Sequence, residues 1–183
     1  ISELGPLIEL LEKPQMATLY TIARDSVVTV PELQGEVDVT KSTVYDYVAA
    51  LQRAGLVSDV ETDGPATKYT AHEFVFTLEV DEMVVEITPD VVAVRLQQDT
   101  NPEIHSFVEQ YGLATLAAFV DLAHDHANGD VTTRMIAEIL DISRGSAYDM
   151  LEHVGRILGI GGEPTTEHAA DLDESDRDEL LER

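Results

Sequence analysis

Residues 40–57 read TKSTVYDYVAALQRAGLV, and this stretch decides the fold. It predicts a helix over residues 41–54, because Thr40 can cap the first turn and Gly55 can end the helix in a left-handed conformation. The apolar side chains of the stretch recur at helical spacing and predict one buried stripe. The residues of this stripe are Val44, Val48 and Leu51.

Two helices are predicted before this stretch and a β-hairpin after it. The first helix covers residues 14–24, where apolar side chains again recur at helical spacing. Thr29 and Glu32 form a capping-box pattern that predicts the start of a short second helix. Strands are predicted over residues 56–60 and 67–70, on either side of an Asp-Gly-Pro turn. Three helices followed by a hairpin are the elements of a winged helix-turn-helix.

The same stretch resembles a known superfamily. Its runs TKSTVY and LQRAGLV look like the recognition helix and the exit of winged helix regulators of the ArsR, IclR and TrmB kind. The resemblance covers residues 14–70 and implies a DNA-binding domain over residues 1–70. In a helix-turn-helix the third helix enters the major groove of DNA. The side chains predicted to contact DNA are Lys41, Ser42, Thr43, Tyr45 and Arg53 on this helix, and Lys68 and Tyr69 on the wing.

The pattern returns 103 residues later in the chain. Val28-Thr29 recurs as Val131-Thr132, and the register continues without a gap over 26 positions. Further identical pairs are Asp38 and Asp141, Tyr45 and Tyr148, Asp46 and Asp149, and Arg53 and Arg156. We infer a second helix-turn-helix-like unit without a convincing wing, which contacts either DNA or protein. Its candidate DNA contacts are Arg134, Arg144, Ser146, Tyr148 and Arg156.

The remaining segments complete a mainly α fold with small β wings, which is an α+β class. Two alternating strands joined by an Asp-Glu turn are predicted within residues 74–87, followed by a helix that Thr88 caps. A longer helix from Asn101 to about His126 is apolar nearly all round over residues 111–123, which predicts full burial between the two units or in a dimer interface. The predicted parts are the first unit over 1–70, a hairpin-and-helix connector over 71–100, the long helix and second unit over 101–162, and a solvated acidic tail over 163–183.

The chain is strongly acidic, but its charge is unevenly placed. Its 183 residues include 36 acidic and 11 basic side chains, for a formal net charge of −25. Residues 71–130 carry −11 and residues 131–162 only −1, and six of the eleven basic residues fall at candidate contact positions of the two units. The composition resembles that of cytoplasmic proteins from halophilic archaea, in which molar salt screens self-repulsion. The alternative is an acidic protein from a mesophile with an ordinary internal salt concentration, which binds a basic partner.

Several other classes of protein are disfavoured. The chain has no cysteine, so it contains neither a disulfide nor a thiolate metal site. No apolar run is long enough for a membrane helix and no signal peptide is visible, so a cytoplasmic protein is expected. His124 and His126 do not share a helix face, and we expect no metal site and no cofactor. No phosphate-binding loop or nucleophile motif is present, so we do not expect an enzyme.

These observations predict a sequence-specific DNA-binding transcription regulator that is adapted to high salt. Its expected partners are double-stranded DNA, a second copy of the chain in a homodimer, and cations such as K⁺ at the DNA interface. Two-fold dimers match the symmetry of pseudopalindromic operators, which favours the homodimer. The alternative is a non-catalytic assembly protein that uses tandem winged helices for chromosome organisation or for protein contacts.

Overall fold

The computed structural model describes residues 5–61, 65–80 and 83–161. The chain is mainly helical and carries two small antiparallel sheets, so the predicted α+β class is confirmed. The predicted Asp-Glu turn at 81–82, most of the Asp-Gly-Pro turn at 63–65 and the acidic tail over 163–183 lie outside the described residues. None of the described helices combines the length and the apolar composition that crossing a membrane requires.

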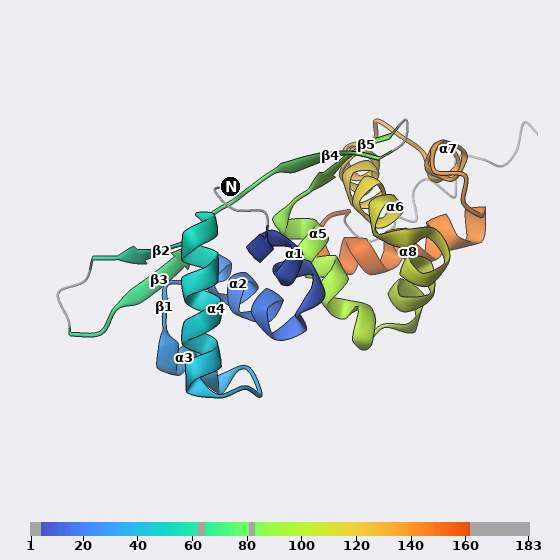
Figure 1. Cartoon of the computed structure of the whole chain (residues 1–183). Coiled ribbons are helices and arrows are strands. Elements are labelled where there is room, and N and C mark those ends of the chain that lie inside the picture. The colour runs from blue at the N-terminus through green and yellow to red at the C-terminus, as the bar shows by residue number, and fades with distance from the viewer. Residues whose placement is uncertain (1–4, 62–64, 81–82, 162–183) are drawn as a thin grey trace, which may run out of the picture.

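The predicted elements follow one another in the predicted order, with α1, β1 and η1 as further elements that were not predicted (Figure 1). The helices are α1 (Gly5–Glu12), α2 (Pro14–Asp25), α3 (Val30–Gly35), α4 (Lys41–Ala54), α5 (Pro89–Leu96), the 3-10 turn η1 (Gln97–Asp99), α6 (Pro102–Asn128), α7 (Thr133–Ile139) and α8 (Arg144–Leu158). The strands are β1 (Val28–Thr29), β2 (Val57–Val60), β3 (Lys68–Ala71), β4 (Phe76–Val80) and β5 (Met83–Ile87). The first three strands form an antiparallel sheet in the order β1-β3-β2, and the last two form a hairpin.

Local capping fixes where the helices of the first unit begin and end. The Thr29 hydroxyl accepts a hydrogen bond from the backbone N–H of Glu32 at 3.4 Å, and the Glu32 carboxylate accepts one from the backbone N–H of Thr29 at 2.7 Å. The Thr40 hydroxyl accepts from the backbone N–H of Thr43 at 3.3 Å and so starts α4. Gly55 ends α4 with a φ of 76°, a conformation that glycine adopts without steric cost. These predictions from sequence are confirmed.

The internal repeat is present helix for helix, and it is longer than the sequence indicated. At the same offset, α3 and α4 correspond to α7 and α8, and α2 corresponds to the second part of α6. The hydroxyls of Thr132 and Ser143 cap α7 and α8 as those of Thr29 and Thr40 cap α3 and α4. Buried positions also correspond in the pairs Met16 and Phe119, Leu33 and Ile136, Val44 and Ala147, and Leu51 and Val154. Each unit therefore consists of three helices with the same inward positions.

The long helix α6 is broken at Gly112, where the prediction of one continuous helix is wrong. Gly112 has φ 84° and ψ 169°, which are not helical angles. The break turns the chain back so that the rings of Phe107 and Phe119 meet with centroids 5.4 Å apart. In a straight helix these two residues would lie about 18 Å apart along the axis. Burial beyond the break is also one-sided rather than complete, because Leu113 and Leu122 are only partly buried and Asp121 is exposed.

Helix α5 lies at the centre of the molecule. Val91, Val92 and Val94 are fully buried, and α5 packs against α1, α2, α6 and α8. Figure 1 shows α1 and α5 between the first unit at one end and α6 to α8 at the other. A single large apolar core therefore runs through both units, and a smaller apolar cluster closes the first unit between α2, α3 and α4.

Two glycines of α8 give a matched test of this packing. A Cβ on Gly155 would lie 2.9 Å from the carbonyl oxygen of Ile160, whereas a Cβ on Gly145 would meet nothing nearer than the Ser143 hydroxyl at 3.8 Å. We expect Gly155→Ala to lower the free energy of unfolding by about 1–3 kcal/mol because of this backbone clash. Gly145→Ala should raise it by up to about 1 kcal/mol through helix propensity. Thermal unfolding followed by circular dichroism checks both values, and a neutral or stabilised G155A variant would contradict the close approach.

Candidate nucleic-acid interface

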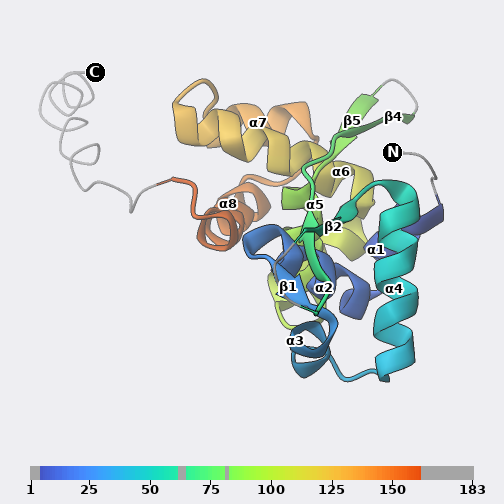
Figure 2. The ribbon, with the colours of Figure 1, turned by 90° about the vertical axis from the view of Figure 1, so that its left-hand side faces the viewer.

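The first unit exposes most of its predicted DNA contacts around the start of α4 and the adjoining sheet. Lys41, Ser42 and Tyr45 are exposed along the first turns of α4, and Lys68 is exposed on β3 beside the half-buried Tyr69. We call these five residues the α4–sheet surface. The α4 helix lies along the edge of the unit, beside the sheet and away from α6 to α8 (Figure 2). The surface is therefore accessible to a large partner.

Aromatic and basic side chains contact one another on this surface. The Lys41 ammonium lies 5.9 Å from the ring centroid of Tyr45, within the range of a cation–π interaction. Tyr45 itself is 49% exposed, so about half of its surface is open to solvent. Burial raises the pKa of the Tyr69 phenol, and the neighbouring Tyr45 and Asp59 raise it further. Lys41 and Tyr45 are therefore neighbours on α4, and Tyr45 lies near enough to Tyr69 on the sheet to influence its ionisation.

The charge of the α4–sheet surface is mixed. Asp46 is exposed directly after Tyr45. Hydrogen bonds from Thr29 hold the pKa of the Glu32 carboxyl below its usual value, and the positive charge of Lys68 lowers it further. Lys68 thus lies near an acid at the start of α3. The surface carries basic groups that can reach phosphate and acidic groups that oppose it.

Two of the predicted contacts in this unit stand apart from the others. Thr43 is half buried, and its hydroxyl lies 2.8 Å from the Thr40 hydroxyl, so it belongs to the helix cap. Arg53 is exposed but lies twelve residues beyond Lys41, which places it about 18 Å further along the α4 axis. The Ser42 hydroxyl is exposed and lies 2.9 Å from that of Thr40.

The second unit holds its basic side chains in pairs with acids of the same helix. Arg134 donates to Glu138 at 2.8 Å, and Arg156 donates to Glu152 at 2.5 Å. Arg134 lowers the pKa of the Glu138 carboxyl, and the charge of Arg144 lowers it further, so Arg144 lies near this pair. These i,i+4 pairs were visible as spacings in the sequence and were not predicted. By contrast, the described residues form no ion pair with Lys41 or Lys68.

The remaining predicted contacts of the second unit are Ser146, which is part of a helix cap as Thr43 is in the first unit, and the exposed Tyr148. The Ser146 hydroxyl lies 2.9 Å from that of Ser143 and takes part in the cap of α8. Tyr148 is 64% exposed, more than its counterpart Tyr45. The described residues after α8, which end at Gly161, contain no strand that could form a wing.

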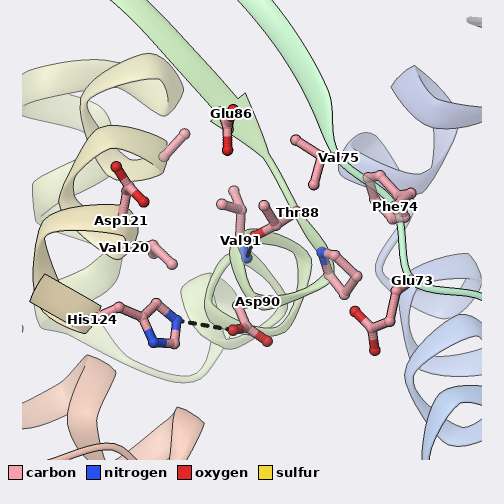
Figure 3. A pocket seen from close by; sticks show the side chains of 12 residues that line it. Glu73, Phe74, Val75, Glu86, Thr88, Asp90, Val91, Val120, Asp121 and His124 are labelled. Atoms are coloured by element: carbon pink, nitrogen blue, oxygen red, sulfur yellow. Dashed lines mark hydrogen bonds and ion pairs between the residues drawn. The ribbon is translucent and has the colours of Figure 1, made fainter. Parts of the chain in front are cut away.

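A separate cavity of about 400 Å³ lies between the segment that follows β3, strand β5, α5 and α6 (Figure 3). Its floor is apolar and includes Phe74, Val91 and Val120, and its sides carry four carboxylates. The lining carboxylates belong to Glu73, Glu86, Asp90 and Asp121. In the part of the chain that the structure describes, no three His, Asp or Glu side chains are placed to hold a metal ion.

An ion-pair network at this cavity joins the first unit to α5 and α6. Arg24 on α2 donates to Glu73 at 2.6 Å and to Asp90 at 3.0 Å, and His124 on α6 lies 3.0 Å from the other oxygen of Asp90. Asp90 is at the start of α5, where a carboxylate also interacts favourably with the helix dipole. Sequence reasoning missed this network because its members are 34 to 66 residues apart and no local pattern links them.

Removing Arg24 should therefore weaken the junction between the first unit and the core. We expect Arg24→Met to lower the free energy of unfolding by about 1–3 kcal/mol, because Asp90 is left with one partner in a partly buried position. Lys13→Met is the matched control, since it removes an exposed pair with Glu9 and should cost much less. Thermal unfolding measures both, and equal effects would show that the network does not stabilise the junction.

Comparison with known proteins gives one family match. A model for a family of unknown function, DUF7437, matches residues 98–158, from within η1 to the last residue of α8. The matched segment covers α6, α7 and α8 and leaves out the first unit and the β4–β5 hairpin. No curated protein matches the chain, and no solved structure matches it.

Proposed function

We propose that this protein is a DNA-binding transcription regulator that contacts duplex DNA through the α4–sheet surface. In this proposal, helices α2, α3 and α4 and the β1-β3-β2 sheet form a winged helix-turn-helix, and α4 enters the major groove of DNA. The major groove is wide enough to admit an α-helix, and the N-terminal turns of a recognition helix lie nearest the bases. The first unit supplies elements in the order that this arrangement requires.

The observation that carries the proposal is the exposed cluster of Lys41, Ser42 and Tyr45 at the start of α4. Lys41 lies over an exposed aromatic ring and forms no ion pair with the described residues, so its ammonium is available to a phosphate or to a guanine edge. The Ser42 hydroxyl can donate to a phosphate oxygen. Lys68 would contact the flanking backbone from the wing, and Arg53 from the far end of α4. The whole chain would act in the cytoplasm as a homodimer.

Three lysines of the chain allow a test with matched charge changes. We expect Lys41→Ala to weaken binding by about tenfold, and Lys68→Ala by less, because Lys41 is central and Lys68 flanking. Lys13→Ala is the control, since Lys13 pairs with Glu9 on α1, outside this surface. Mobility shifts in molar KCl, on duplexes that the wild-type protein selects from a random library, measure the affinities. Unchanged binding by the K41A variant contradicts the assigned surface, and selection of no duplex at any salt favours the assembly protein instead.

The salt dependence of binding is a second, independent prediction. Ordinary DNA binding weakens as salt rises, because released counterions favour it at low salt. Here Asp46 and Glu32 lie among the basic groups, so cations such as K⁺ must neutralise them before phosphate can approach. We therefore expect affinity to hold or to rise between moderate and molar KCl.

Removing one of these acids provides the control for the salt effect. Asp46→Asn keeps the size of the side chain and removes its charge, so it should shift the dependence toward the ordinary fall with salt. A steep fall in wild-type affinity between moderate and molar KCl, with no difference in the D46N variant, would contradict a role for cations at this interface.

A further inference from the structure

The second unit exposes apolar side chains where a helix-turn-helix would approach DNA. Met135 and Ile139 lie one turn apart on α7 and are 43% and 59% exposed, and Tyr148 on the adjoining helix α8 is 64% exposed. Thr133, Ile136 and Ala137 form the opposite, buried side of α7. We call Met135, Ile139 and Tyr148 the α7–α8 face.

The first unit carries acids at the corresponding positions of its second helix. At the offset of 103, Met135 corresponds to Glu32 and Ile139 to Glu36, and both glutamates are exposed. Two solvent-facing acids of the repeat are thus replaced by apolar side chains in a chain of net charge −25. Exposed apolar residues that lie together on one face are typical of protein contacts rather than of a solvated surface.

We propose that the α7–α8 face is the surface through which two copies of this chain associate. This inference rests on the homodimer of the proposed function and assigns its interface. In a two-fold contact the same patch meets itself, so residue i of one copy faces residue j of the other and the reverse. If two α7 helices pack antiparallel about Met135 and Ile139, Arg134 of one copy faces Glu138 of the other. The ion pair that each α7 now makes internally can then be exchanged between copies.

Charge also distinguishes this face from the other exposed apolar patch. Val75, Leu78 and Val84 are exposed in and next to the β4–β5 hairpin, but residues 71–130 carry a net charge of −11. Residues 131–162 carry only −1, so two copies meet there with the least repulsion. The face also lies away from the first unit, because α7 and α3 are at opposite ends of the molecule in both views (Figures 1 and 2). A dimer formed here leaves both α4–sheet surfaces accessible to DNA.

The test restores the acids of the first unit at the equivalent positions of the second. We expect the wild-type protein to sediment as a dimer in molar KCl and the Met135→Glu, Ile139→Glu double variant as a monomer. Val84→Glu is the control, because it places the same charge on an equally exposed apolar side chain of the hairpin and should leave the dimer intact. Circular dichroism melts verify that each variant folds; the substituted side chains are exposed, so little stability is lost.

A cross-linking measurement covers the case in which the double variant fails to fold. The chain has no cysteine, so a single Ile139→Cys substitution gives one thiol for each copy. Because Ile139 of one copy faces Met135 of the other, the two thiols lie too far apart for a direct disulfide, and a bis-maleimide that spans about 10 Å should link two copies of the I139C variant and none of V84C. A monomeric wild type, a dimeric M135E/I139E variant that folds, or cross-linking through position 84 alone would each overturn the proposal.

The same samples separate this proposal from that of DNA binding. If the interface is right, the K41A variant stays dimeric while its DNA affinity falls. Loss of DNA binding with an intact dimer is thus specific to the α4–sheet surface. A wild-type dimer that depends on the α7–α8 face but selects no duplex would refute the regulator and leave the interface in place.

Discussion

Burial of α5 is the constraint on which the rest of the structure depends. An isolated helix of eight residues is not stable in water, so α5 exists only because its valines are enclosed by helices from both units. Thr88 caps α5 and Pro89 supplies a preformed first turn, which reduces the stabilisation that tertiary packing must provide. Three-helix units of this size bury little apolar surface alone. The shared core around α5 therefore stabilises both of them at once.

This shared core also fixes the geometry between the two candidate surfaces. Arg24 on α2 and His124 on α6 both hold Asp90, so the first helix of one unit and the corresponding helix of the other are tied to the same carboxylate. A flexible linker would let the units turn independently, and no such linker separates them among the described residues. In the proposed dimer the distance between the two α4 helices is then set by packing, and if α4 binds DNA as proposed, this distance would determine the half-site spacing.

The features predictable from sequence are those that local chemistry decides. Thr29, Glu32, Thr40 and Gly55 each act on backbone groups within a few residues of their own position. Their patterns therefore predicted the helix boundaries correctly. The break at Gly112 was missed because a glycine within an apolar helix costs only about 1 kcal/mol and does not by itself end the helix. The break follows from tertiary packing of Phe107 on Phe119, which no local pattern contains.

The features of the candidate site also divide into those that local sequence predicts and those that depend on tertiary structure. The exposed start of α4 followed from helix periodicity and from the resemblance, whereas its closeness to Tyr69 depends on how the sheet pairs. The Arg24 network and the central place of α5 link distant segments and had no signal in the sequence.

Divergence of the two units explains why a repeat is useful in so acidic a chain. Two identical three-helix units would present the same mixed surface twice, and two copies of the chain would then meet there with acids on both sides. Replacing Glu32 and Glu36 by Met135 and Ile139 at the equivalent positions removes charge where association is proposed and retains it where DNA binding is proposed. Apolar burial does not depend on charge screening, so such an interface persists from moderate to molar salt. Under the two proposals, one fold supplies a DNA-binding surface and a self-association surface, and the change from Glu32 and Glu36 to Met135 and Ile139 is one part of the difference between them.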